Sequence, residues 1–146
     1  MPQNSPSFKY KVNHDKISCD CPKLDELHSV NMIAYRFVHQ DTTHKNCYLP
    51  NRIINPNRKC KNCIEECNCY ALSFFNDISE AEKALRYHAT NTPALILVVG
   101  DHIASCKLEK NDGLAEKKIF RGHFNFHEFE GTEFKDRFYD AIKLEI

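Results

Sequence analysis

The sequence has no excess of either charge, no long apolar run and no internal repeat. Lysine plus arginine and aspartate plus glutamate each number 20, so the formal net charge at pH 7 is zero. This balance excludes a global field that would attract nucleic acid or a membrane surface, so binding of that kind needs a local patch. The longest apolar run, Ala94–Val99, is too short to cross a bilayer. We therefore expect a soluble protein with no membrane role.

The first residues, MPQNSPSFKYKVNHDK, are polar and contain neither the apolar segment nor the cleavage site of a secretory signal peptide. The length of 146 residues suits one domain that builds its core without obligatory disulfides. We expect a flexible N-terminal arm over residues 1–18 and a single globular domain over residues 19–146. The same features predict reduced thiols and a cytoplasmic location.

Segments rich in aromatic and β-branched residues predict strands along much of the chain. These segments are residues 31–39, 70–75, 94–99, 103–108 and 123–129. In the last of them Phe124 and Phe126 alternate with polar residues, which is typical of a half-buried strand. The run at 94–99 is wholly apolar, which predicts burial on both faces.

Ser79 and Glu82 form a capping box that predicts a helix ending near Ala89. The C-terminal residues 134–146 fit either a short helix or a final strand. Residues 40–59 contain two prolines and several asparagines, so we expect a long irregular connection that is functional or poorly ordered. Together these elements predict an α+β domain, mainly antiparallel, with one or two helices and a cysteine-rich insertion.

That insertion holds four of the eight cysteines in the pattern CxxCxxxCxC. A CxxC pair on a tight turn supplies two zinc ligands, here Cys60 and Cys63, and Cys67 and Cys69 could complete the set. Alternative sets combine Cys60 and Cys63 with two residues from elsewhere in the chain. These partners are either Cys19 and Cys21, or Cys47 and His44.

Two other interpretations of the cysteines remain open. Cys60, Cys63 and Cys67 have the i, i+3, i+7 spacing of the apolar side of a short helix, where free cysteine packs as a small hydrophobic residue. Disulfide or redox chemistry is the third possibility. Cys106 alternates within an apolar strand and is predicted to lie in the core.

Three short marks occur in a defined order along the chain: Arg36 in the strand AYRFV, then Tyr70-x-x-Ser73, then Glu128-x-Glu130. This order resembles the arginine, aromatic-x-x-serine and ExE marks of ADP-ribosyltransferases. The resemblance implies a split antiparallel sheet or sandwich that binds NAD in a cleft. It also implies that Arg36 holds a phosphate or ribose of NAD, and that Ser73, with Tyr70, forms the nicotinamide side of the pocket.

The same resemblance implies that Glu130 hydrogen-bonds the nicotinamide ribose. Loss of nicotinamide leaves positive charge on that ribose, and a fixed carboxylate stabilises this charge most in the transition state. Glu128 would orient an acceptor nucleophile or take its proton. His123 and His127 are rival acid or base candidates on the same strand. The expected function is transfer of ADP-ribose from NAD to a macromolecular acceptor.

The alternative function is a small, non-enzymatic zinc-binding module that contacts a partner protein or a nucleic acid. Four basic residues beside the cysteines would then present a patch to a phosphate backbone. They are Arg52, Arg58, Lys59 and Lys61.

Overall fold

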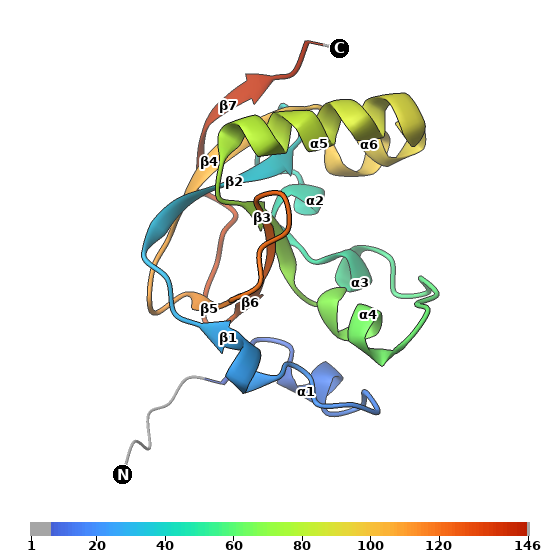
Figure 1. Ribbon diagram of the computed structural model, residues 1–146, viewed down its shortest axis with the longest axis vertical. Helices are drawn as coiled ribbons and strands as arrows, with labels where there is room; N and C mark the ends of the chain where they lie inside the picture. Colours follow the sequence, from blue (N-terminus) through green and yellow to red (C-terminus); the bar gives the residue numbers. More distant parts are fainter. Residues whose placement is uncertain (1–6, 146) are drawn as a thin grey trace.

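The computed structural model describes residues 7–145, which form one antiparallel sheet with helices beside it (Figure 1). The strands are β1 (Leu27–His28), β2 (Met32–Val38), β3 (Leu72–Phe75), β4 (His102–Leu108), β5 (Gly113–Glu116), β6 (His123–Glu128) and β7 (Phe138–Lys143). The helices are α1 (Lys11–His14), the 3-10 turn η1 (Leu24–Glu26), α2 (Lys45–Tyr48), α3 (Asn51–Ile54), α4 (Cys63–Asn68), α5 (Ile78–Asn91) and α6 (Pro93–Val99). The predicted α+β class is confirmed.

The seven strands follow the order β1-β5-β6-β3-β2-β4-β7, and every neighbouring pair is antiparallel. β2 pairs with β4 along its whole length, from Met32 opposite Leu108 to Val38 opposite His102. In contrast, β2 pairs with β3 only at Tyr35 opposite Phe75. The sheet is therefore split between its two halves at this point, rather than built as two stacked sheets.

Aromatic side chains fill one side of the sheet. Phe124 and Phe126 of β6 are both buried, as predicted, but His127 and Glu128 are buried as well, so the predicted alternation does not continue to the end of the strand. The ring of Phe74 lies 6.2 Å from that of Phe124, and Phe134 from the C-terminal segment packs 5.9 Å from Phe74. Burial of this phenylalanine cluster is the main apolar contribution to the fold, at roughly 2 kcal/mol for each side chain.

Helix α5 covers the other side of the sheet, where Ala81 and Leu85 are fully buried in a cluster with Phe75 and Ile103. The helix begins earlier than predicted because Asp77 is its N-cap. Its carboxylate accepts hydrogen bonds from the backbone N–H groups of the next two polar residues, Ser79 at 2.8 Å and Glu80 at 3.2 Å. These bonds satisfy amides that have no partner within the helix.

Residues 93–99 form helix α6, so the strand predicted for 94–99 is wrong. Pro93 occupies the first turn, where its fixed φ angle favours a helix and its missing N–H costs nothing. The run is not buried on both faces, since Leu97 is 80% exposed. The helix ends at Gly100, whose φ of 89° suits glycine, and a Cβ there would lie 2.1 Å from the carbonyl oxygen of Val38.

The part of the predicted N-terminal arm that the structure describes packs on the domain, and residues 1–6 lie outside the described range. Phe8 forms a bridge with Phe129 at the end of β6. His14 of α1 is buried beside His127, with 5.8 Å between the ring centroids. Residues 7–18 therefore belong to the globular domain, and the predicted boundary at residue 19 does not match the packing.

Three segments remain: the C-terminal strand, the short strand β5 and the connection 40–59. Residues 138–143 form strand β7, one of the two possibilities for the tail. The short strand β5 was not predicted, because four residues beginning with Gly113 give too little alternation. The connection 40–59 contains the single-turn helices α2 and α3 and continues toward α4 (Figure 1).

We predict that Asp77→Ala lowers the free energy of unfolding by about 1 kcal/mol, because it removes the N-cap of α5. Urea unfolding followed by circular dichroism measures the change. Glu82→Ala is the matched control, because the sequence suggested a capping box that includes Glu82. An equal or larger loss in Glu82→Ala would contradict the assignment of Asp77 as the cap.

We also predict that His127 makes the fold sensitive to acid. Burial lowers the pKa of His127 to about 4, whereas an unfolded histidine titrates near 6.5. Between pH 6.5 and pH 4 His127 binds a proton in the unfolded state but not in the folded state. The free energy of unfolding therefore falls as the pH decreases. The slope is about 1.4 kcal/mol per pH unit for this one group.

In the variant His127→Leu the free energy of unfolding should decrease less between pH 6.5 and pH 4 than in the unaltered protein. Urea titrations at several pH values measure this. The exposed residue His28 provides the control substitution His28→Leu. Identical pH slopes for His127→Leu and the unaltered protein would show that His127 is not a source of acid sensitivity.

Candidate functional site

A cavity of about 400 Å³ lies where β2 and β3 separate. The strands contribute Arg36, Phe37, Ser73 and Phe75 to its wall, and α5 contributes His88. The segment from α2 to α4 contributes further polar and charged residues, namely Asn46, Asn51, Arg58, Glu65 and Asn68. The long connection that the sequence marked as irregular therefore forms part of the wall.

Arg36 occupies the gap between the two strands. Its Nε donates a hydrogen bond of 2.7 Å to the carbonyl oxygen of Cys47, and its Nη1 donates one of 2.9 Å to the carbonyl oxygen of Ser73. Burial lowers the pKa of Arg36 to about 10, so the guanidinium still carries its charge at neutral pH.

Arg36 has no carboxylate within ion-pair distance among residues 7–145, although the charge of Glu128 acts on it from farther away. None of the ion pairs formed within residues 7–145 includes Arg36, and its Nη2 has no hydrogen-bond partner in that range. A partly buried cation without an ion-pair partner is costly, and arginine presents a planar fork of donors that matches phosphate or carboxylate. Because Arg36 lines the cavity, its guanidinium is suited to an anionic ligand.

Ser73 and His123 form a second polar pair at the cavity. The Nε2 of His123 on β6 lies 3.1 Å from the Oγ of Ser73 on β3, and these two strands are paired neighbours in the sheet. Burial lowers the pKa of His123, so the imidazole is neutral at pH 7 and can accept the hydroxyl proton. Within the described chain no carboxylate is bonded to this histidine, so the pair lacks the third group of a catalytic triad.

Aromatic rings supply the apolar part of the wall. The rings of Phe37 and Phe75 lie 5.2 Å apart at an interplanar angle of 35°, and His88 meets Phe37 edge-on at 6.4 Å. Apolar walls with a few oriented polar groups are typical of small-molecule sites. His88 and Asn46 were missed as site residues, because their spacing in the sequence does not distinguish them from ordinary helix and loop residues.

The predicted catalytic carboxylates lie elsewhere. Glu128 is buried and forms an ion pair of 3.0 Å with Lys9 from the N-terminal segment. Its burial raises its pKa, an effect that Lys9 opposes. Glu130 lies beyond the end of β6 with an exposed side chain, and its backbone N–H donates to the carbonyl oxygen of Ser7. Neither glutamate lines the cavity with Arg36 and Ser73.

Two further predicted residues are also outside the cavity. Tyr70 is 9% exposed and packs against Tyr10 and His14, with ring centroids about 6 Å away. His127 is covered by the same N-terminal segment. The structure therefore brings together Arg36, Ser73 and the rival candidate His123, and separates them from the predicted tyrosine, carboxylates and second histidine.

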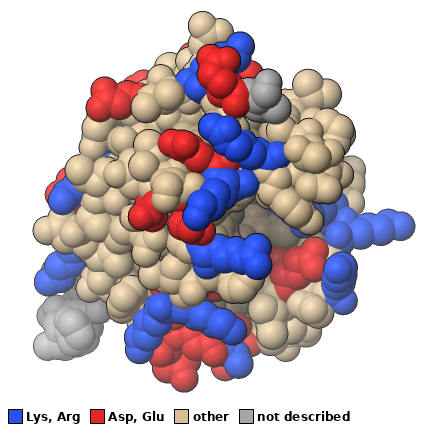
Figure 2. Space-filling model, turned by 45° about the horizontal axis from the view of Figure 1, so that its top comes forward, with Lys and Arg blue, Asp and Glu red and all other residues tan. Residues whose placement is uncertain are grey.

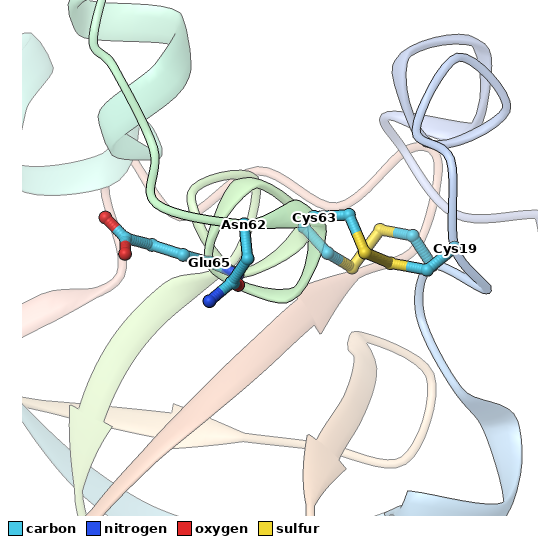
Figure 3. The surroundings of a disulfide bond; sticks show 6 residues. Cys19, Asn62, Cys63 and Glu65 are labelled. Atoms are coloured by element: carbon cyan, nitrogen blue, oxygen red, sulfur yellow. A yellow bond between two sulfur atoms is a disulfide. The ribbon is translucent and has the colours of Figure 1, made fainter.

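The cysteines are arranged differently from every predicted metal set. Cys63 and Cys67 of α4 form disulfides with Cys19 and Cys21, and the Cα atoms of the two pairs are 6.1 and 5.6 Å apart. Figure 3 shows the first of these bonds joining the N-terminal loop to α4. The prediction of reduced thiols is wrong for these four residues, because the CxC loop packs directly against the side of α4 that carries Cys63 and Cys67.

Cys60 and Cys69 are free thiols, so only two of the four predicted zinc ligands keep a thiol. Across residues 7–145, no group of three or more histidine, cysteine or acidic side chains is placed to hold a metal ion. The predicted set of Cys60, Cys63, Cys67 and Cys69 is not a ready metal site in this disulfide-bonded form. Cys106 is fully buried in the core, as predicted.

The basic residues near the cysteines are largely engaged within the chain. Arg52 donates to two backbone carbonyls and lies 3.6 Å from the carboxylate of Glu66, and Arg58 lies 3.5 Å from that of Glu65. Lys59 and Lys61 are exposed. On the face drawn in Figure 2, basic and acidic side chains are intermixed among the described residues, without an extended area of one sign.

Comparison with protein-family models, with curated proteins and with solved structures finds no match for this chain. Among the described residues no helix is both long and apolar enough to span a membrane.

Proposed function

We propose that the protein binds NAD, or another nucleotide that carries a phosphate group, in the cavity between β2 and β3. The supporting observation is Arg36, a partly buried and charged residue of the cavity wall whose Nη2 makes no hydrogen bond among residues 7–145. A phosphate oxygen at Nη2 would make a charge-assisted hydrogen bond and would balance the arginine.

The other wall residues fit the remaining parts of such a ligand. The rings of Phe37 and Phe75 offer an apolar surface to a base or a nicotinamide ring. Ser73, Asn46 and His88 supply hydrogen-bonding groups for a ribose or an amide. The volume of about 400 Å³ lies within the usual range for small-molecule pockets.

The ADP-ribosyl transfer implied by the sequence resemblance needs a carboxylate beside the ribose. Glu65 is the acidic residue that lines the cavity, whereas Glu128 and Glu130 do not line it. In this proposal Ser73 and His123 orient the bound nucleotide, and Glu65 takes the position next to the sugar. The acceptor of any transfer is a macromolecule that approaches the open side of the cavity.

Isothermal titration with NAD, ADP and inorganic phosphate tests the proposal. We expect NAD and ADP to bind, and Arg36→Lys to weaken both by about tenfold to a hundredfold, because one ammonium cannot serve two carbonyls and a phosphate together. Arg86→Gln removes a positive charge from the exposed face of α5 and should leave affinity unchanged. Glu130→Gln should also leave it unchanged.

Circular dichroism and urea unfolding check that each variant is folded. If Arg36→Lys is unfolded, Ser73→Val and Arg58→Gln test the same cavity without disturbing the backbone contacts of Arg36. Absence of NAD and ADP binding at millimolar concentration would overturn the proposal. Equal affinity in all the cavity variants would overturn it as well.

A further inference from the structure

We propose that Cys60 and Cys69 are a reactive thiol pair that forms a third, reversible disulfide beside the cavity. Their Sγ atoms lie 3.6 Å apart without a bond, at the two ends of the segment that contains α4. A disulfide requires about 2.0 Å between the sulfurs, so a small rotation of the two side chains would bring them to bonding distance. The bond would close the segment 60–69 on itself.

The two thiols have different surroundings, which assigns them different roles. Cys60 is partly exposed, and the Nη2 of Arg52 lies 3.2 Å from its Sγ. The attacking thiol in disulfide exchange must be accessible to the small disulfide, and Cys60 is the more exposed of the two. Cys69 is 5% exposed, and burial together with its hydrogen bond to Cys60 raises its pKa to about 11. Cys60 is thus the group that reacts first.

The oxidant in this proposal is a low-molecular-weight disulfide such as oxidised glutathione. The Cys60 thiolate attacks one sulfur of that disulfide, forms a mixed disulfide and releases one glutathione thiolate. Cys69 then loses its proton to solvent and attacks the Sγ of Cys60, which releases the second glutathione thiolate. The protein loses two electrons and two protons, and the small disulfide gains both as two thiols.

The other free cysteines do not share this arrangement. Cys47 and Cys106 are both fully buried, and burial raises the pKa of each thiol. The Sγ of Cys47 is held by the backbone N–H of His39 at 3.2 Å. The four disulfide-bonded cysteines are already oxidised. The pair of Cys60 and Cys69 is therefore the redox-active site among the described cysteines.

The pair is coupled to the cavity through Cys69, which lines it together with Glu65 of the same segment. Asn62 is the N-cap of α4 inside this segment, and its side chain accepts a hydrogen bond from the backbone N–H of Glu65 (Figure 3). Closing the disulfide would hold this part of the wall in one conformation and reduce the entropy lost on ligand binding. This coupling rests on the proposed nucleotide site, whereas the disulfide itself does not.

The test incubates the full chain in buffers with increasing ratios of oxidised to reduced glutathione, then quenches in acid and alkylates the remaining thiols. Peptide mass spectrometry should show a Cys60–Cys69 linkage that grows with the ratio and is lost again in reduced glutathione. Cys47 and Cys106 should remain alkylatable after denaturation. The bonds of Cys63 and Cys67 to their partners should remain throughout.

Two variants sharpen this test. Cys69→Ser should trap glutathione on Cys60 as a mixed disulfide, whereas the control Cys106→Ser should form the Cys60–Cys69 bond as the unaltered protein does. The proposal is overturned if both thiols stay free at every ratio. A different pairing of Cys60 also overturns it.

Titration of ADP into the reduced and oxidised forms tests the coupling separately. The oxidised form should bind at least threefold more tightly, and Cys60→Ser should lose its response to the glutathione ratio. Equal affinity for ADP in both forms would reject the coupling, but it would not contradict formation of the Cys60–Cys69 disulfide. Absence of ADP binding in both forms rejects the nucleotide site, while the alkylation result still decides the disulfide.

Discussion

The interaction on which the site depends is the pair of hydrogen bonds from Arg36 to the backbone. Where β2 and β3 separate, the carbonyl of Ser73 lacks the partner on β2 that a continuous sheet would provide. Arg36 replaces that partner and also binds the carbonyl of Cys47. The split sheet therefore places a charged guanidinium inside the domain, and the cavity is the space around it.

Two disulfides hold α4, the helix whose residues Glu65 and Asn68 line the cavity. Both join α4 to the loop at Cys19 and Cys21, so the helix is attached to the N-terminal part of the domain at two points one turn apart. Such cross-links stabilise a fold mainly by restricting the unfolded chain. They also fix the segment that carries Arg58 and Glu65, and they are typical of an oxidising environment rather than of the reducing one expected from the sequence.

Local patterns predicted the strands well where side chains alternate, as at Phe124 and Phe126, and they predicted the class of the fold. They failed at residues 94–99, because a wholly apolar run shows neither the alternation of a strand nor the periodicity of a helix. Pro93 favours the first turn of a helix, and the segment is helical. The cysteine partners are separated by more than 40 residues, so spacing alone could not pair them. Arg36 and Ser73 were predicted, but Glu128 pairs with Lys9 and Glu130 lies beyond the end of β6, so neither glutamate lines the cavity.

The most direct test of the central claim is to follow the side-chain guanidinium signals of Arg36 by nitrogen NMR while ADP is added. The account predicts that the Arg36 resonances shift with saturation, while those of the exposed residue Arg86 stay constant. Saturable binding of ADP that leaves the Arg36 signals unchanged would contradict the account, because the ligand would then occupy another part of the protein.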